Sequence, residues 1–353
     1  MFVAGAAASL LTSWVLVVRI ERIGARLGAS EALLGLLAAL AADAPEITSA
    51  VSALTRHQTD VGAGVVVGSN VFNLAALLGL AAVVAGGIRL HRPVVVLAGA
   101  VALGVAGVTV ATATGALPVG AGLGLTLAIL APAVALAMVD HSRLHRLAGR
   151  SRLGAWLDRA VTEEELDLEP AIHPRRGRGG DVAVGAVALA VVVVASVAME
   201  RAATDLGHRV PGIVIGGIVL AAVTSLPNAV AAVYLARRGR GAAVLSTAMN
   251  SNALNVAAGF MIPAAILGAG RTNGSEVLVC GWYAGLTAVA LLLAWRGLTR
   301  RAGALILAAY AGFVAVVVIG AGTDLAHRPV LVYLAPGLVL AATVALVAQR
   351  PPQ

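Results

Sequence analysis

Two short clusters of oxygen-bearing side chains lie in segments of this chain that are otherwise almost entirely apolar. Asp43 and Glu46 are three residues apart, so on a helix both carboxylates point to roughly the same side. Ser69 and Asn73 are four residues apart and share one helix face in the same way. Carboxylate, amide and hydroxyl oxygens are the ligands that hard cations such as Ca²⁺, Na⁺ and Mg²⁺ prefer. The two clusters therefore indicate a cation site.

Both clusters recur 182 positions further along the chain. The string A-D-A-P-E at 42–46 corresponds to T-S-L-P-N at 224–228, and G-S-N-V-F-N at 68–73 corresponds to N-S-N-A-L-N at 250–255. Most of the matching positions are polar or helix-breaking, which is unusual in such an apolar chain. The pattern is typical of duplicated membrane transporters, whose ion site lies where the two halves meet. The second cluster adds the candidate ligands Thr224, Ser225, Asn228, Ser251 and Asn255.

The composition is that of a protein that crosses the membrane many times. Apolar residues make up 59% of the chain and charged residues 12%, with a mean hydropathy of +0.94. Stretches of about 20 apolar residues recur throughout, and each is long enough to cross a bilayer core of about 30 Å. We predict eleven membrane helices, at 2–18, 31–55, 61–85, 93–113, 118–139, 181–200, 211–236, 242–268, 277–295, 302–322 and 330–348.

The predicted helices place the polar clusters at mid-membrane depth. A carboxylate there costs roughly 2.5–3.5 kcal/mol on insertion scales, so two in one helix require compensation. No arginine within a predicted helix is placed to pair with Asp43 or Glu46, which leaves a bound cation or a proton. Pro45 and Pro227 add to the argument, because each lacks an amide hydrogen and should free a carbonyl near Ala41 and Val223 respectively. A cation could occupy these carbonyls.

The net charge of +8 does not indicate a nucleic-acid partner. All 25 basic residues are arginine, and if the N-terminus faces outside, 20 of them fall in inner segments and 5 in outer ones. The positive-inside rule explains this division. We therefore expect a multi-pass protein of the plasma (inner) membrane, with lipid and inorganic cations as its partners. The sequence indicates no cofactor and no particular protein partner, and it contains no zinc motif or nucleophile–base arrangement typical of an enzyme.

The repeats divide the chain into two halves of opposite orientation. They begin at the second and seventh predicted helices, and a shift of five crossings makes the second copy enter the membrane from the opposite side. The predicted fold is an all-α membrane protein with two inverted-topology repeats of five helices and one additional C-terminal helix. Its segments are 1–139 (first half, repeat at 35–79), 140–180 (cytoplasmic linker), 181–322 (second half, repeat at 217–261) and 323–353 (additional helix and tail).

The two clusters resemble the repeats of the sodium/calcium exchanger superfamily, which have the form G-T-S-x-P-E followed by G-S-N-x-F-N. The spacing from Glu46 to Ser69 is 23 residues, as is that from Asn228 to Ser251, and the close similarity covers about 45 residues in each half. The resemblance implies a ten-helix core with alternating access, in which the first and sixth helices slide. It also implies a set of ion ligands, namely Glu46, Ser69, Asn73, Thr224, Ser225, Ser251, Asn255 and the backbone carbonyls near Ala39 and Ala221.

Two departures from the family pattern move one carboxylate between the halves. Asp43 stands where the family has serine, and Asn228 stands where it has an acid. The number of carboxylates stays at two, so divalent binding remains reasonable. We expect an antiporter that moves Ca²⁺ against Na⁺ or H⁺, because a carboxylate pair in a low dielectric also holds a proton. Alternatives are a proton-coupled antiporter for Mg²⁺, Mn²⁺ or K⁺, and a non-transporting membrane scaffold or sensor.

Overall fold

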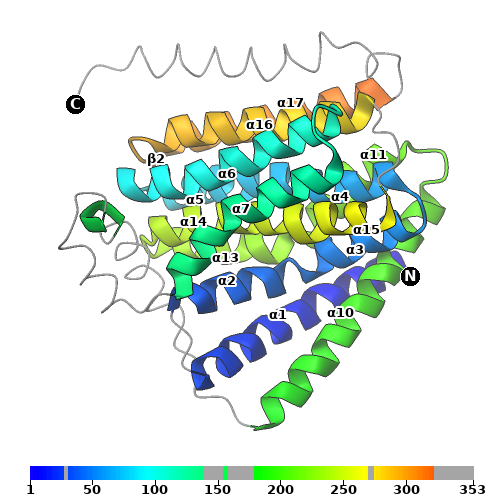
Figure 1. The fold of residues 1–353 in the computed structure, drawn as a ribbon, viewed down its shortest axis with the longest axis horizontal. Coiled ribbons are helices and arrows are strands. Elements are labelled where there is room, and N and C mark those ends of the chain that lie inside the picture. Colours follow the sequence, from blue (N-terminus) through cyan, green and yellow to red (C-terminus); the bar gives the residue numbers. More distant parts are fainter. Residues whose placement is uncertain (28–30, 139–153, 158–178, 269–273, 322–353) are drawn as a thin grey trace.

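The computed structural model describes residues 1–27, 31–138, 154–157, 179–268 and 274–321, and within these the chain is almost wholly helical (Figure 1). The predicted helix at 330–348 and most of the 140–180 linker lie outside the described residues. The first half contains α1 (Phe2–Arg26), α2 (Glu31–Ala42), α3 (Ala44–Thr55), α4 (Thr59–Asn73), η1 (Leu74–Leu80), α5 (Ala81–Ala85), α6 (Arg92–Ala113) and α7 (Val119–Met138). The second contains α10 (Gly179–Leu206), α11 (Gly212–Val214), η2 (Ile215–Leu220), α12 (Ala221–Thr224), α13 (Leu226–Arg237), α14 (Gly241–Leu254), η3 (Asn255–Met261), α15 (Ile262–Leu267), α16 (Gly274–Ala294) and α17 (Arg300–Ala321).

The helices form a multi-span membrane fold. Seven of the described helices are long and apolar enough to cross a bilayer, and two bent helix pairs raise the number to nine. The run from α14 to α15 is not among these nine, since its serines and asparagines make it more polar. The prediction of an all-α fold is confirmed, with one small addition in the described part. The addition is a two-residue antiparallel ribbon of β1 (Gly87–Ile88) and β2 (Leu298–Thr299).

Two of the predicted helices are each broken in the middle. The segment predicted as one helix at 31–55 ends at Ala42 and restarts at Ala44, with a bend of 52°. The segment at 211–236 breaks at Ser225 in the same way, with a bend of 47°. Pro45 and Pro227 each occupy one of the first two positions of the helix that follows, where a missing amide hydrogen costs least. The prediction of single continuous helices was wrong here, because the prolines begin new helices rather than only disturbing old ones.

The helix boundaries of the two halves match over most of the fold. Adding 182 to Ala44–Thr55 gives 226–237, the bounds of α13, and adding it to Thr59 gives 241, the first residue of α14. The same addition to Arg92–Ala113 gives 274–295, beside Gly274–Ala294 of α16. The repeat seen in the polar clusters therefore extends to the helices that carry them.

The helices α1 and α10 lie together at one edge of the molecule, oblique to the remaining helices (Figure 1). They have a small apolar cluster of their own, formed by Leu16, Ala188 and Val192 with Ala41 of α2. Most of the other buried apolar residues belong to one larger cluster, which includes α4, η1, α14 and α16. In that cluster α4 is central, because nearly every residue from Val61 to Asn73 is buried. The fold thus consists of a compact core and a two-helix pair against it.

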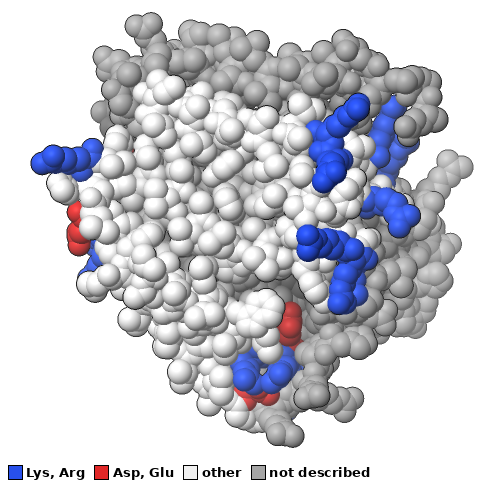
Figure 2. Space-filling model, turned by 180° about the vertical axis from the view of Figure 1, so that it is seen from behind, with Lys and Arg blue, Asp and Glu red and all other residues white. Residues whose placement is uncertain are grey.

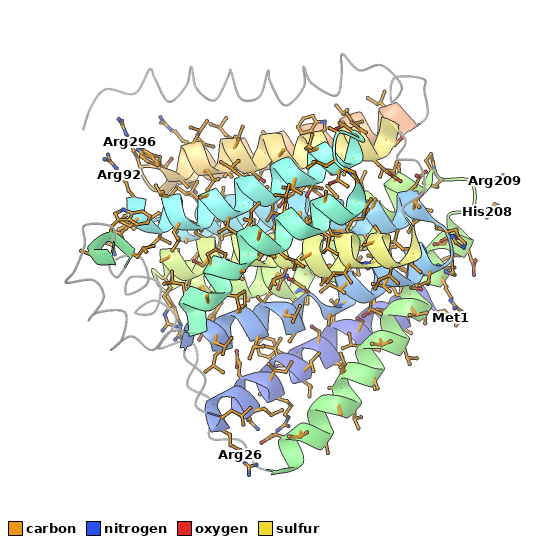
Figure 3. The ribbon with its side chains drawn as sticks, viewed as in Figure 1. Met1, Arg26, Arg92, His208, Arg209 and Arg296 are labelled. Carbon is orange, nitrogen blue, oxygen red and sulfur yellow. The ribbon has the colours of Figure 1, made fainter. Side chains whose placement is uncertain are left out.

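Charged side chains mark two opposite faces of the molecule. Arg92 and Arg296 lie at one end and Met1, His208 and Arg209 at the other, while Arg26 lies at the lower tip of the oblique α1 (Figure 3). We call these ends the Arg92 face and the Met1 face. Seen from behind, a broad uncharged area separates the basic groups at the two sides of the molecule, and a further group of basic and acidic side chains lies at its lower edge (Figure 2). Such an uncharged area fits the hydrocarbon layer of a membrane, and the separation agrees with the predicted alternation of inner and outer arginines.

Candidate cation site

The predicted ligands meet inside the core, where the two halves of the chain face each other. Asp43 and Ser225 lie at the two helix breaks, Glu46 and Asn228 lie one turn further on, and α4 and α14 bring in the serines and asparagines. The side chains of all nine predicted ligand residues are buried. The sequence places these residues far apart, so their assembly depends on the close packing of the halves.

Asp43 is held by two donors from the second half of the chain. The Asn228 side-chain amide donates to Oδ1 of Asp43 at 2.8 Å, and the Ser251 hydroxyl donates to the same oxygen at 2.7 Å. The other carboxylate oxygen, Oδ2, is buried and accepts no hydrogen bond. The carboxylate is therefore fixed through one oxygen while the other is left available to a ligand.

Glu46 has the corresponding arrangement. The Ser225 hydroxyl donates to Oε1 of Glu46 at 2.8 Å, and Oε2 is buried and accepts no hydrogen bond. Adding 182 to positions 43 and 46 gives 225 and 228, so the contacts of Glu46 with Ser225 and of Asp43 with Asn228 occupy equivalent positions. Each of these two contacts contains one carboxylate and one neutral hydrogen-bond donor.

Four asparagines connect α4 to the α14–η3 segment. The side-chain amide of Asn70 donates to the backbone carbonyl of Asn252 at 2.9 Å, and the side-chain amide of Asn252 donates to the backbone carbonyl of Asn70 at 3.0 Å. The Asn73 amide donates to the Ser251 hydroxyl at 3.2 Å and to Oδ1 of Asn252 at 3.1 Å, while the Asn255 amide donates to Oδ1 of Asn70 at 3.4 Å. The Oδ1 atoms of Asn73 and Asn255 are buried and accept no hydrogen bond.

Asn70 and Asn252 were missed as members of the site. Both lie in the repeated strings, and their exact correspondence at an offset of 182 was the signal that could have identified them. Their reciprocal bonds occupy their polar atoms, so we assign them to the scaffold that orients Asn73 and Asn255.

Several other predicted ligands bond within their own helices. The hydroxyl of Ser69 donates to the Val66 carbonyl at 2.9 Å, and that of Thr224 donates to the Leu220 carbonyl at 2.9 Å. The carbonyls of Ala39 and Ala221 accept ordinary helical bonds at 2.9 and 3.2 Å from Asp43 and Ser225 respectively. A hydroxyl or carbonyl oxygen that takes part in one such bond still has a lone pair for a cation. The Ala221 carbonyl also accepts a bond of 3.3 Å from the Thr224 hydroxyl, so a cation there would replace this second bond.

The carbonyl of Ala41 has a different partner from the one expected. Pro45 frees this carbonyl, as predicted, and the Ser13 hydroxyl of α1 approaches it at 3.4 Å. The sequence suggested a cation as its partner, but in the structure a side chain of the two-helix pair takes that place. The break in the helix is thereby linked directly to α1.

The donor set favours a hard cation. Its atoms are carboxylate, amide and hydroxyl oxygens, with two acidic side chains among them. The described residues contain no group of three or more His, Cys, Asp and Glu side chains that could hold a metal. A transition-metal centre of nitrogen and sulfur ligands is therefore not what this arrangement offers. Two negative charges with several neutral oxygens suit one divalent cation or a small number of monovalent ones.

Comparisons with known proteins identify the family of this chain. The family model described as "Sodium/calcium exchanger protein" matches residues 1–157 and 181–319. A putative antiporter, CaxA of Alkalimonas amylolytica, is 32% identical over 87 residues, which cover 24% of this chain and 27% of that protein. The chain thus aligns with only about a quarter of the length of this relative.

Solved structures have the same fold at low sequence identity. The H⁺/Ca²⁺ exchanger CAX matches with a TM-score of 0.65 and 12% identity over 99% of this chain and 90% of that one. The protein YfkE matches with a TM-score of 0.61 and 16% identity, over 90% and 92% of the two chains. The sodium–calcium exchanger NCX_Mj matches with a TM-score of 0.51 and 18% identity, over 89% and 96%.

The family match covers most of the chain and includes both polar clusters. It confirms the resemblance inferred from the two repeats, and it identifies a transporter rather than an enzyme. This chain belongs to the sodium/calcium exchanger family of membrane cation antiporters.

Proposed function

We propose that this antiporter moves Ca²⁺ across the membrane in exchange for Na⁺ or H⁺, and that the transported ions bind between the two helix breaks. The ligands would be the side chains of Asp43, Glu46, Ser69, Asn73, Thr224, Ser225, Asn228, Ser251 and Asn255, with the carbonyls of Ala39 and Ala221.

One observation carries this proposal. Among the predicted ligands, four buried oxygens accept no hydrogen bond, namely Oδ2 of Asp43, Oε2 of Glu46 and the Oδ1 atoms of Asn73 and Asn255. Buried polar atoms are nearly always satisfied, and a buried carboxylate oxygen without a partner is especially unfavourable. A bound cation would satisfy all four, and two carboxylates would balance the charge of one Ca²⁺. Asn228 carries no charge of its own, and it contributes to the site through the hydrogen bond that it donates to Asp43.

The contacts support two inverted repeats around this site. Asn70 and Asn252 exchange equivalent bonds, as two groups related by a two-fold axis do. A shift of five spans reverses the direction of the second copy, which makes such an axis lie in the membrane plane. Alternating access would then come from movement of the α1–α10 pair against the core.

The orientation follows from the arginines. We assign the Arg92 face to the cytoplasm, together with the linker at 140–180, and the Met1 face to the outside. The excess of arginine on inner segments supports this assignment and a location in the plasma membrane.

The test is Ca²⁺ uptake into proteoliposomes under an imposed Na⁺ gradient or an imposed pH gradient. Uptake driven by Na⁺ and lost in Glu46→Gln would identify Na⁺ as the counter-ion, while uptake driven only by the pH gradient would identify H⁺. Mg²⁺, Mn²⁺ and K⁺ are assayed in the same vesicles as competing substrates. Full uptake by Glu46→Gln would refute the site, and the absence of flux for every cation would refute transport.

A further inference from the structure

The helices α1 and α10 are joined to each other along their length. Arg19 of α1 bonds to Asp181 of α10 at 2.5 Å, and Arg22 lies 3.7 Å from the same carboxylate. Further along, the hydroxyls of Ser9 and Ser196 are 2.7 Å apart. These polar contacts lie within the pair and are independent of the core.

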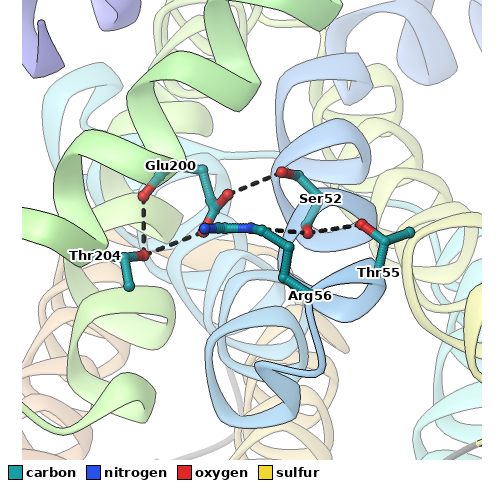
Figure 4. Close-up of polar contacts among 5 residues, drawn as sticks. All are labelled: Ser52, Thr55, Arg56, Glu200 and Thr204. Carbon is teal, nitrogen blue, oxygen red and sulfur yellow. Dashed lines mark hydrogen bonds and ion pairs between the residues drawn. The ribbon is translucent and has the colours of Figure 1, made fainter.

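A second polar cluster joins the pair to the core instead (Figure 4). Glu200 of α10 is fully buried, and its carboxylate accepts a bond from the Ser52 hydroxyl of α3 at 2.9 Å. Arg56, which follows the last residue of α3, forms an ion pair with the other carboxylate oxygen of Glu200. Thr204, one turn further along α10, donates to this oxygen at 3.1 Å. We call Glu200, Arg56 and Ser52 the latch.

Breaking the latch is energetically unfavourable. A buried carboxylate without its partner carries a large desolvation penalty, so α10 can leave α3 only if another group or water replaces Arg56. An ion pair within a membrane protein that has no part in ion binding also calls for an explanation. The latch contains none of the ligand residues, and it lies at the end of α3 away from the helix break at Asp43.

A polar hollow lies beside the latch on the Met1 face. Its volume is about 320 Å³, and its lining includes Thr204, His57 and Asp60. It reaches the first turn of α4, the helix that carries Ser69 and Asn73. The hollow does not reach the ligands, since Asp43 and Glu46 are 0% exposed. The Met1 face is therefore closed above the site in this structure.

We propose that the latch holds α10 on α3 in the state closed at the Met1 face, and that its opening lets the hollow deepen towards the cation site. Glu200 and Arg56 are positioning residues in this scheme and bind no transported ion. The inference rests on the proposed alternating access, but its main test needs no transport.

The test measures the accessibility of Val61, a residue of α4 that lines the hollow and is 4% exposed. The sole cysteine, Cys280, is buried, so Cys280→Ala with Val61→Cys gives one reporter thiol. A membrane-impermeant thiol reagent is added on the Met1 side. Glu200→Gln and Arg56→Gln are each expected to raise the labelling rate about tenfold, within the usual range of conformational coupling. Arg56→Lys keeps the positive charge, so its labelling rate should stay close to that of the parent protein.

Asp181→Asn is the matched control, because it removes another α10 carboxylate that pairs with arginine, but within the pair. Its labelling rate should equal that of the parent. Glu46→Gln should block transport without raising the labelling rate, which separates failure of the latch from failure of the cation site. Equal labelling in the parent and in Glu200→Gln would overturn the proposal.

Cross-linking provides a second measurement, in which a removable covalent link takes the place of the latch. A short thiol cross-linker across Ser52→Cys and Glu200→Cys should arrest transport, and reduction of a cleavable linker should restore it. A disulfide between Ser9→Cys and Ser196→Cys should leave transport intact, because both residues belong to the pair. Transport that survives the Ser52–Glu200 cross-link would contradict the latch.

Discussion

The side-chain amide of Asn228 donates a hydrogen bond of 2.8 Å to the carboxylate of Asp43, so the second half of the chain holds an acid of the first. The equivalent contact joins Ser225 to Glu46 at 2.8 Å. Both acids come from the first half, yet each of the two contacts contains one carboxylate. Each contact therefore has one carboxylate, although the two acids occupy different positions of the repeat, that of Glu46 in one contact and that of Asp43 in the other.

This relationship predicts that Asp43 and Asn228 can exchange side chains. Asp43→Asn removes one of the two negative charges and should weaken Ca²⁺ binding by about 100-fold or more, since even outer-shell changes cost roughly 10–100-fold. The double variant Asp43→Asn with Asn228→Asp returns the carboxylate to the same contact with little change in volume, and should recover most of the loss. Ca²⁺ uptake as a function of concentration measures both variants. If the double variant binds Ca²⁺ as weakly as Asp43→Asn does, the negative charge must come from position 43 itself, at the helix break before α3.

Removal of the hydroxyl of Ser225 should weaken Ca²⁺ binding without abolishing transport. Ser225→Ala leaves Glu46 charged but without the donor that fixes Oε1, so the carboxylate has more freedom to rotate. We expect the KM for Ca²⁺ to rise about tenfold or more, because the variant loses both this donor and the proposed ligand oxygen of Ser225, and loss of an outer-shell partner alone costs roughly 10–100-fold. Ser246→Ala, which removes another buried hydroxyl from outside the ligand set, is the control and should keep the native KM. An unchanged KM in Ser225→Ala would mean that this hydroxyl does not orient Glu46.

Much of the fold could be predicted from sequence because membrane helices have simple requirements. Length and hydropathy predicted the first and last residues of α6, α7, α16 and α17 to within a few positions, because each helix must cross the same thickness of hydrocarbon. The breaks at Asp43 and Ser225 were not predicted, although the prolines beside them were noted. Whether a proline kinks a helix or begins a new one depends on what satisfies the freed carbonyl, and here the Ser13 hydroxyl comes from a distant helix.

The sequence identified the polar residues that meet between the two halves, but not the contacts that they make. The offset of 182 residues identified Asp43, Glu46 and their second-half counterparts, because polar residues in an apolar helix are conspicuous. It could not show that Asp43 contacts Asn228, since a partner in the other half is set by tertiary packing. The same reason explains why Glu200 was not singled out. Its partner Arg56 lies 144 positions away in the sequence.

The reciprocal bonds of Asn70 and Asn252 predict a structural role for both residues. Asn252→Ala removes the side-chain amide that donates to the Asn70 backbone carbonyl and the Oδ1 atom that accepts from Asn73, and should lower the free energy of unfolding by about 1–3 kcal/mol. Thermal unfolding of the detergent-solubilised protein measures the change. Thr114→Ala is a suitable control, because this exposed hydroxyl bonds only to carbonyls of its own helix. Equal unfolding temperatures for Asn252→Ala and Thr114→Ala would contradict the assignment of Asn252 to the scaffold.

The close approach of α4 to η2 predicts that Gly68 cannot be enlarged. A Cβ at this position would lie 2.2 Å from the carbonyl oxygen of Gly217, so either helix would have to move. Gly68→Ala should therefore destabilise the protein by about 1–3 kcal/mol, as overpacking of a tight contact does. It should also impair Ca²⁺ uptake, because Ser69 is the next residue. Gly107→Ala is the matched control on α6, where a Cβ would meet nothing within 4 Å, and it should retain uptake and stability.

The four buried oxygens of the proposed ligands that lack hydrogen-bond partners predict that Ca²⁺ stabilises the folded protein. A cation that binds only the folded state should add about 2.7 kcal/mol at a free concentration of 100 times its Kd. The unfolding temperature in detergent should rise with Ca²⁺ and return on addition of a chelator. In Glu46→Gln the rise should shrink or vanish, because Oε2 of Glu46 is one of these oxygens. A Ca²⁺-dependent rise of equal size in Glu46→Gln and the parent would place the stabilising ion elsewhere in the molecule.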